Sequence, residues 1–165
     1  MAIFSQVVPL ILDLEGNTVS DNPTDYGGKT KYGISKKQFP SIDIDNLTID
    51  GAMKLFEKEY WLRYRLSEIC DQSIANQIFL LIINMNPINA GKIVQRAINS
   101  SLHTSPCVID GSIGSNTLTA LNSVCSILLG AMLRVEACRY YLALVDNDES
   151  QRINFRGWIR RALHE

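Results

Sequence analysis

Three residues near the start of the chain have side chains and a spacing that suit acid–base chemistry. Glu15 ends an apolar run, Asp25 follows ten positions later, and Thr30 five positions after that. The surrounding residues 14–35 are rich in asparagine, proline and glycine, which form turns and allow close approach to the backbone. Hydrolysis of a glycosidic bond needs a proton donor and a second group that stabilises positive charge or activates water. We therefore interpret residues 14–35 as an active-site loop, with Glu15 as the acid, Asp25 as the second group and Thr30 as a residue that orients water.

A helix predicted over residues 3–14 positions Glu15. Apolar side chains recur there at helical spacing, and Pro9 either kinks the helix or belongs to its first turn. Glu15 then lies at the helix C-terminus, where the backbone dipole disfavours a negative charge and should raise the pKa of the carboxyl group. A raised pKa suits a proton donor. The alternative is an ordinary solvated glutamate on the surface.

The rest of the chain is patterned mainly for helices. Residues 115–145 form either one helix or two helices that separate near Gly130. The one strand pair that the pattern supports sets residues 18–19 opposite residues 32–34. The predicted fold class is therefore mainly α, with a small irregular β-hairpin loop near the N-terminus. Periodic apolar residues predict the other helices over residues 49–60, 73–85, 88–99 and 152–163.

Two residues in the predicted helices suit either contact with a sugar or an ordinary structural role. Trp61 has arginines nearby and could line a cleft, but a core position explains it at least as well. Asn84 ends a stretch that is apolar almost all round, and it either reaches a cleft or simply ends the helix. A buried amide without a partner costs about 1–3 kcal/mol, so Asn84 needs a partner if it is buried.

Composition indicates a single soluble globular domain. The 165 residues are enough to bury a continuous core, and 46% hydrophobic with 20% charged residues excludes disordered and collagen-like classes. A formal net charge of −1 gives no basic surface for nucleic acid. The sequence shows neither a long apolar stretch for a membrane span nor the basic region and cleavage site of a signal peptide.

The cysteines and histidines do not suggest a metal site. Four cysteines, at positions 70, 107, 125 and 138, include no CxxC pair, and only two histidines are present. Cys125 and Cys138 fall within apolar helical patterns, where small buried thiols are common, so we favour free thiols over two disulfides. His103 has no positioned partner in the sequence and is interpreted as a surface loop residue.

The sequence resembles the lysozyme-like N-acetylmuramidases of glycoside hydrolase family 108. The N-terminal signature of that family reads roughly EGGY, then an Asn/Asp/Pro-rich turn, then DxGGxTxxGI. Glu15-Gly16 is similar to its start, and residues 25–34, DYGGKTKYGI, are similar to its second part throughout. The likeness continues at Tyr60-Trp61, at Asn84 and Pro87, in VQRA at 94–97, in DGSIG at 110–114 with Thr117, in Tyr140-Tyr141 and in FRGW at 155–158.

The resemblance implies a fold, an activity and a set of site residues. It implies a lysozyme-like helical fold in one compact domain, 1–165, with a catalytic half at 1–88 and, at 89–165, a helical half that resembles a peptidoglycan-binding module. The implied reaction is cleavage of the β-1,4 bond between N-acetylmuramic acid and N-acetylglucosamine, without metal or cofactor. The implied catalytic residues are Glu15, Asp25 and Thr30, and the implied substrate contacts are Gly28, Tyr32, Trp61 and Asn84.

The implied partner is bacterial peptidoglycan. We expect a monomer that is made in the bacterial cytoplasm without a signal peptide and acts in the periplasm or cell wall. Its release would require a phage holin or a secretion system.

The sequence also departs from the family signature. Asn17 and Thr18 replace a Gly-Tyr pair, Leu14 replaces a common histidine, and Leu80 replaces an acidic residue. Loss of the tyrosine weakens an expected sugar contact, whereas the two leucines make the surroundings of Glu15 more apolar. Two alternatives therefore stay open: a non-catalytic peptidoglycan-binding or secretion-associated protein that retains the fold, and a helical structural domain.

Overall fold

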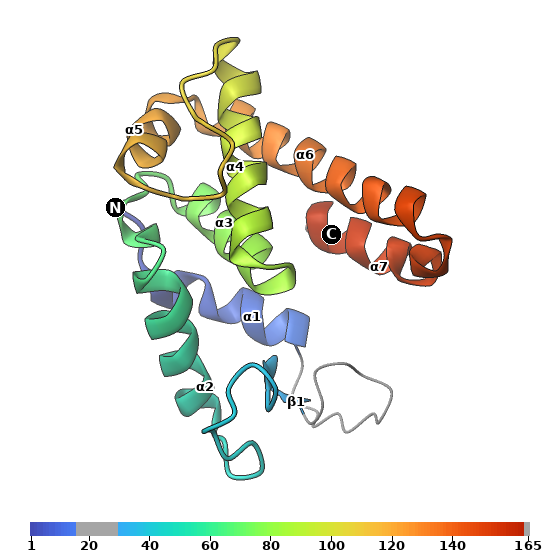
Figure 1. Ribbon diagram of the computed structural model, residues 1–165. Helices are drawn as coiled ribbons and strands as arrows, with labels where there is room; N and C mark the ends of the chain where they lie inside the picture. The colour runs from blue at the N-terminus through green and yellow to red at the C-terminus, as the bar shows by residue number, and fades with distance from the viewer. Residues whose placement is uncertain (16–29, 164–165) are drawn as a thin grey trace. The chain divides into compact units, whose positions relative to one another are not determined.

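The computed structural model describes residues 1–15 and 30–163, and these form two compact units. The N-terminal unit is Ile3–Arg63, and the C-terminal unit is Tyr64–Glu165 together with Met1–Ala2. Helices dominate both units, and one two-stranded antiparallel sheet lies in the N-terminal unit (Figure 1). The elements agree with the predicted mainly α fold that carries a small hairpin near its N-terminus.

The N-terminal unit begins with two short helical segments. A 3-10 turn is followed directly by α1, and Pro9 is the second residue of α1. A proline in the first helical turn removes no internal hydrogen bond, so of the two predicted alternatives the first-turn position is the one observed. The elements of this unit are η1 Phe4–Gln6, α1 Val8–Glu15, β1 Thr30–Lys31, β2 Ile34–Ser35, α2 Ile49–Phe56 and the π-helical η2 Glu57–Leu62.

The hairpin differs in register from the predicted strand pair. Lys31 pairs with Ile34 and Thr30 pairs with Ser35, so the turn consists of Tyr32 and Gly33. Both turn residues have positive φ, 52° and 75°, as the tight turns that match strand twist require. The expectation that residues 32–34 form one strand is thus corrected: positive φ places Tyr32 and Gly33 in the turn. The expected partner strand, residues 18–19, lies outside the described residues.

Aromatic side chains form the core of the N-terminal unit. The Trp61 side chain is 1% exposed and meets the Phe4 ring edge to face, with 5.7 Å between ring centroids. Tyr60 contacts the rings of Phe56 and Phe39, at centroid distances of 5.9 and 6.4 Å, and its hydroxyl accepts a hydrogen bond from Gln38. The π-helical turn η2 places Tyr60 and Trp61 in the core from consecutive positions.

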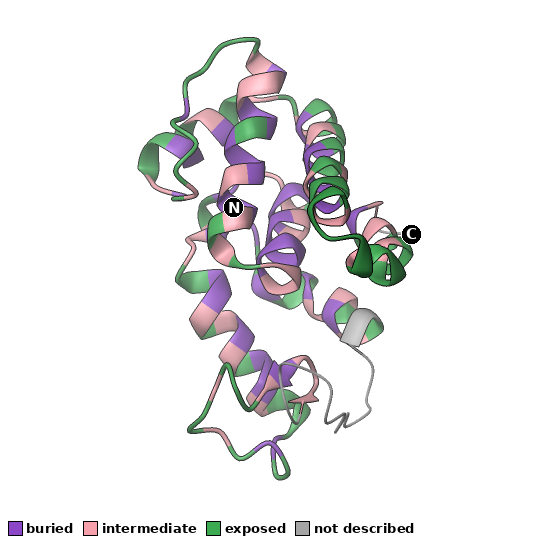
Figure 2. Cartoon of the chain, turned by 45° about the vertical axis from the view of Figure 1, so that its right-hand side comes forward, coloured by how far each residue is buried: buried purple, intermediate pink, exposed green. Residues whose placement is uncertain are grey.

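The C-terminal unit is a set of packed helices around α3. This helix is buried over most of its length and packs against α4 and α6, while α6 also packs against α4 and α7. Figure 2 shows α7, which ends near the C-terminal label, mostly in the colour of exposed residues, and Ala162 is its buried residue. The elements are η3 Leu66–Glu68, α3 Gln72–Asn84, α4 Pro87–Leu102, α5 Ser115–Ser123, α6 Ser126–Asn147, η4 Glu149–Gln151 and α7 Arg152–Leu163.

Two helices occupy the stretch predicted as one or two, and they do not separate at Gly130. The break falls at Val124, whose extended backbone ends α5, and the two helices bend by 119° there. Gly130 instead lies buried inside α6, where a Cβ atom would be 3.5 Å from the Ile74 side chain of α3. Within the described part of the chain, no helix by itself is long and apolar enough to cross a membrane, and the bent α5–α6 pair meets that test only jointly.

The structure places the four cysteines as free thiols in different surroundings. Cys107 is buried and Cys138 is half-buried, and burial raises the pKa of both thiols. Cys125 is exposed and precedes the first residue of α6, so its predicted role as a buried filler is wrong.

Asp71 caps the N-terminus of the central helix α3. Its Oδ1 atom accepts hydrogen bonds from the backbone N–H groups of Ser73 and Ile74, at 2.9 and 3.1 Å, and from the Ser73 hydroxyl at 2.6 Å. The hydroxyls of Ser73 and Ser126 lower the pKa of Asp71 by hydrogen bonding to its carboxylate. The charged form is therefore the one that the folded protein stabilises.

Substitution Asp71→Ala is expected to lower the free energy of unfolding by about 1–2 kcal/mol at neutral pH, the usual loss for a helix cap. Because the pKa of Asp71 is lower in the folded than in the unfolded state, this contribution should shrink as the pH falls below about 4. Urea unfolding at pH 7 and at acidic pH measures both effects. Asp146→Ala, at an exposed position of α6, is the control and should change stability by less than about 0.5 kcal/mol. Equal losses in the two variants would contradict the assignment.

Candidate functional site

The predicted acid lies at the end of a helix. Glu15 is the last residue of α1, as the apolar pattern predicted. Asp25 and Gly28, the predicted second catalytic residue and a predicted substrate contact, lie outside the described residues. The structure therefore locates the helix terminus that carries Glu15 and the strand that follows the loop, β1.

The hairpin after the loop carries two predicted site residues. Thr30 is half-buried and opens β1, and Tyr32 is half-buried in the turn. The Lys31 ammonium group donates a hydrogen bond to the Asp45 carbonyl at 2.9 Å and lies 5.5 Å from the centre of the Tyr32 ring. A second lysine, Lys36, donates to the Ile42 carbonyl at 2.7 Å. These bonds attach the hairpin to residues 42–45, so Thr30 stands on a supported element.

The other two predicted substrate contacts have different surroundings. The Trp61 ring is almost fully buried, which fits the core alternative rather than a cleft wall. Asn84 is the last residue of α3 and is half-buried in the C-terminal unit. It lines a small cavity together with Gln77, Leu80, Leu81, Tyr141, Arg161 and Ala162. Burial raises the pKa of Tyr141 to about 12, so this phenol stays protonated beside Asn84.

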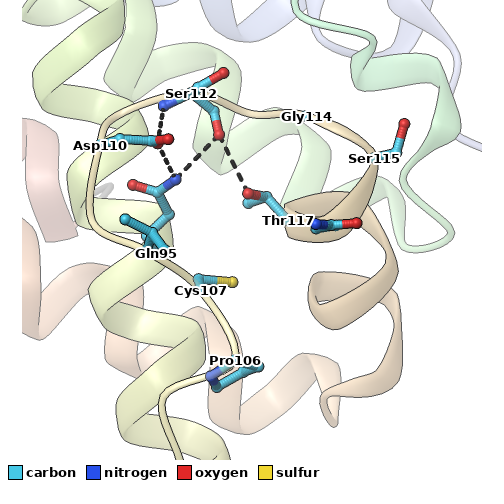
Figure 3. A pocket seen from close by; sticks show the side chains of 10 residues that line it. Gln95, Pro106, Cys107, Asp110, Ser112, Gly114, Ser115 and Thr117 are labelled. Carbon is cyan, nitrogen blue, oxygen red and sulfur yellow. Dashed lines mark hydrogen bonds between the residues drawn. The ribbon is translucent and has the colours of Figure 1, made fainter.

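The C-terminal unit also contains a larger, open pocket of about 330 Å³. It lies between the loop that follows α4 and the first turn of α5, and Figure 3 shows Thr117 and Cys107 facing into it from those two segments. Its lining consists of Gln95, Pro106, Cys107, Val108, Asp110, Ser112, Gly114, Ser115, Asn116 and Thr117.

The side chain of Gln95 holds one wall of this pocket in place. Gln95 is 1% exposed, and its amide nitrogen donates to the Asp110 carboxylate at 2.7 Å and to the Ser112 carbonyl at 3.0 Å. Its amide oxygen accepts from the Gly111 N–H group at 2.8 Å. Three hydrogen bonds from one buried side chain fix the backbone of residues 110–112, because a lost partner would leave a buried polar group unsatisfied.

A second amide, one helical turn further along α4, holds the beginning of the same loop. Asn99 donates to the Cys107 carbonyl at 2.9 Å and accepts from the Cys107 N–H group at 3.0 Å. The loop also lies directly on α4, because a Cβ atom at Gly91 would be only 2.0 Å from the Gly111 carbonyl oxygen. Gly111 itself has a φ of +85°, which favours glycine. The loop is thus fixed by two amides and by two facing glycines.

The pocket has a charged wall and a neutral floor. Hydrogen bonds from the Gln95 side chain and then the Ser112 N–H group lower the pKa of Asp110, so its carboxylate stays ionised. Burial raises the pKa of Cys107, which keeps the thiol protonated. The Thr117 hydroxyl donates to the Ser112 carbonyl at 3.2 Å and joins the floor to the loop.

The sequence motifs include part of this pocket, although they do not reveal how its side chains meet. The VQRA and DGSIG segments both belong to the motifs identified above, but nothing in their spacing shows that the Gln95 side chain reaches Asp110. Two sequence features could have pointed to the pocket: a glutamine within an apolar helical pattern and, after it, a turn with two glycines. No comparable sequence feature pointed to Asn99, Asn116 or the exposed Val108.

Comparison with known proteins finds two matching families, one for the N-terminal part of the chain and one for the C-terminal part. The glycosyl hydrolase 108 model matches residues 8–85, which include Glu15, Asp25 and Thr30. The predicted peptidoglycan domain model matches residues 89–163, which include the whole lining of the larger pocket. No curated protein sequence matches the chain.

A solved structure shares the fold. The structure of Brucella abortus SagA superposes with a TM-score of 0.79 over 98% of this chain and 90% of that chain, at 20% sequence identity. At this identity the likeness establishes the fold alone, and it confirms the lysozyme-like, mainly helical fold expected from the sequence. The match over residues 8–85 supports a glycoside hydrolase, and the match over residues 89–163 supports peptidoglycan as its target. Residues 8–85 thus belong to the glycosyl hydrolase 108 family, and residues 89–163 belong to the predicted peptidoglycan domain family.

Proposed function

We propose that this protein is an N-acetylmuramidase that hydrolyses the β-1,4 bond between N-acetylmuramic acid and N-acetylglucosamine in peptidoglycan. The observation that carries the proposal is the glycosyl hydrolase 108 match over residues 8–85, joined in the same chain to a peptidoglycan domain match. The two matched regions act on the same target only if the glycan that the hydrolase region cleaves is peptidoglycan.

Glu15 is the proposed general acid. It ends α1, and the carbonyl dipoles of a helix C-terminus disfavour a carboxylate and favour the protonated carboxyl group. A protonated carboxyl group can give its proton to the glycosidic oxygen as the bond to the leaving sugar breaks. The departing sugar then leaves as a neutral alcohol.

Asp25 and Thr30 are proposed to complete the reaction. A second carboxylate stabilises the positive charge that develops at the anomeric carbon, or it activates the attacking water. Thr30 stands on the hairpin that Lys31 attaches to the Asp45 carbonyl, and its hydroxyl is proposed to orient that water. Gly28 and Tyr32 are proposed to contact the sugar near this hairpin.

We further propose that the protein acts as a monomer in the periplasm or cell wall. Residues 1–88 would supply catalysis and residues 89–165 would supply attachment to peptidoglycan. A holin or a secretion system is the proposed route of release.

Zymography and product analysis on purified cell walls test the proposal. The protein is expected to clear a gel that contains peptidoglycan and to release fragments whose new reducing ends are N-acetylmuramic acid, identified by borohydride reduction and mass spectrometry. Reducing N-acetylglucosamine ends would assign a different bond. Sedimentation with the walls without clearing would identify a non-catalytic binder, the alternative that the Asn17-Thr18 departure from the family signature favours.

A further inference from the structure

We propose that the pocket between residues 106–112 and the start of α5 binds the peptide side chains of peptidoglycan rather than its sugar strand. The proposal rests on the proposed function, because it takes the cell wall as the target, and it goes further by assigning a ligand class and a site to the C-terminal unit. The pocket volume of about 330 Å³ lies within the range of about 300–1,000 Å³ usual for ligand sites.

Hydrogen bonds within the protein preorganise the pocket. Its floor consists of the buried Gln95, Cys107 and Thr117, which are 1%, 6% and 5% exposed. The Gln95 and Asn99 amides fix both ends of the loop, and Thr117 bonds the Ser112 carbonyl across the pocket. A wall held by buried hydrogen bonds loses little conformational entropy when a ligand binds.

The two sides of the pocket attract opposite charges. Asp110 supplies a carboxylate that suits an amine on the ligand. On the other side α5 begins at Ser115, and Gly114 provides no side chain to cap its first N–H groups. The N-terminal turn of a helix without such a cap favours a carboxylate. A ligand with both an amine and a carboxylate therefore matches the pocket better than a neutral sugar does.

The rim of the pocket favours a peptide for a separate reason. Val108, which is 78% exposed, lines the pocket together with Pro106, and the two offer an apolar surface that small side chains can cover. None of the ten residues that line the pocket is aromatic, so it offers no flat ring against which a sugar can stack. Peptidoglycan stem peptides combine alanine methyl groups, free carboxylates and the amine of a diamino acid, which are the groups that these surfaces accept.

Calorimetric titration of the full chain with a synthetic tripeptide tests the proposal. The probe is L-alanyl-γ-D-glutamyl-meso-diaminopimelate, and chitotetraose is the sugar control. Substitution Asn116→Glu sets a carboxylate at the start of α5 inside the pocket, where it competes with the carboxylate of the peptide. Thr119→Glu adds the same charge at an exposed position of the same helix outside the pocket lining. We expect Asn116→Glu to raise the dissociation constant for the tripeptide about tenfold, and Thr119→Glu to change it less than about twofold.

A second probe tests the amine side. Acetylation of the free side-chain amine of diaminopimelate should weaken binding about fivefold or more, because the amide no longer carries a charge opposite Asp110. Equal losses in both variants, a weak effect of acetylation, or tighter binding of chitotetraose than of the tripeptide would each overturn the assignment. Because the tripeptide contains no glycosidic bond, its binding is independent of hydrolysis. Clearing without tripeptide binding would reject the pocket and keep the muramidase, whereas tripeptide binding without clearing would reject the muramidase and keep the pocket.

Discussion

Replacing Glu15 with glutamine is expected to slow the lysis of purified peptidoglycan at least about 100-fold. A positioned general acid contributes typically about 10²–10⁴ in rate, and an amide of the same shape cannot donate a comparable proton to the leaving oxygen. The substitution should leave the fold intact because glutamine preserves the size of the side chain at the last residue of α1. Release of reducing sugar over time, at a fixed amount of cell wall, measures the rate.

Asp13→Asn provides the matched control for that experiment. Asp13 is an exposed residue of the same helix, two positions before Glu15, and its substitution makes the same change from a carboxyl group to an amide. The control should keep lysis within about twofold of the unmodified protein, and circular dichroism should give similar helix content for both variants. Full activity in Glu15→Gln, or equal losses in the two variants, would exclude Glu15 as the acid.

Gly91→Ala is expected to destabilise the protein, although alanine favours helices. Helix propensity alone predicts a gain of about 1 kcal/mol for this change in the interior of a helix. At this position, however, a Cβ atom would lie 2.0 Å from the Gly111 carbonyl oxygen and 2.5 Å from its carbonyl carbon. The backbone of the loop or of α4 must therefore shift, and overpacking of this kind costs typically about 1–3 kcal/mol and sometimes more.

The measurement for Gly91→Ala is the unfolding midpoint. After the gain in helix propensity is subtracted, a net loss of about 1–2 kcal/mol lowers the melting temperature of a chain of this size by roughly 2–8 °C. Gly157→Ala in α7 is the control, because no atom lies within 4 Å of the added Cβ there, and it should gain up to about 1 kcal/mol. An unchanged or raised midpoint in Gly91→Ala would show that the loop yields without cost.

The helices could be predicted from the sequence because their signal is local. Apolar periodicity gave the bounds of α3 and α7 to within one residue, and the end of α1 at Glu15 followed from the same pattern. The α5–α6 break was misplaced because a buried glycine reads as an interruption. Gly130 instead lies inside α6, where an added Cβ atom would make an ordinary van der Waals contact of 3.5 Å with the Ile74 side chain of α3.

The strand pairing could not be predicted from alternation alone. Each strand of the observed hairpin has two residues, too few to show a period of two. The pairing depends on the positive φ of Tyr32 and Gly33. Of these two residue types, only glycine commonly adopts positive φ, so only Gly33 predicts the turn. The sequence nevertheless located the hairpin in the loop region, because glycine and β-branched residues gather there.

The sequence by itself determined the helical class, the position of Glu15 at a helix end and the motifs of the glycosyl hydrolase family, because these depend on neighbours within a few turns of chain. Only the tertiary structure decided that Trp61 belongs to a core and that Gln95 fixes Asp110 across fifteen positions of sequence. Contacts of that kind depend on how a loop returns to its helix, and here the return requires Gly91 to face Gly111. Long-range packing, which local sequence patterns do not specify, thus brings the VQRA and DGSIG motifs together in one pocket.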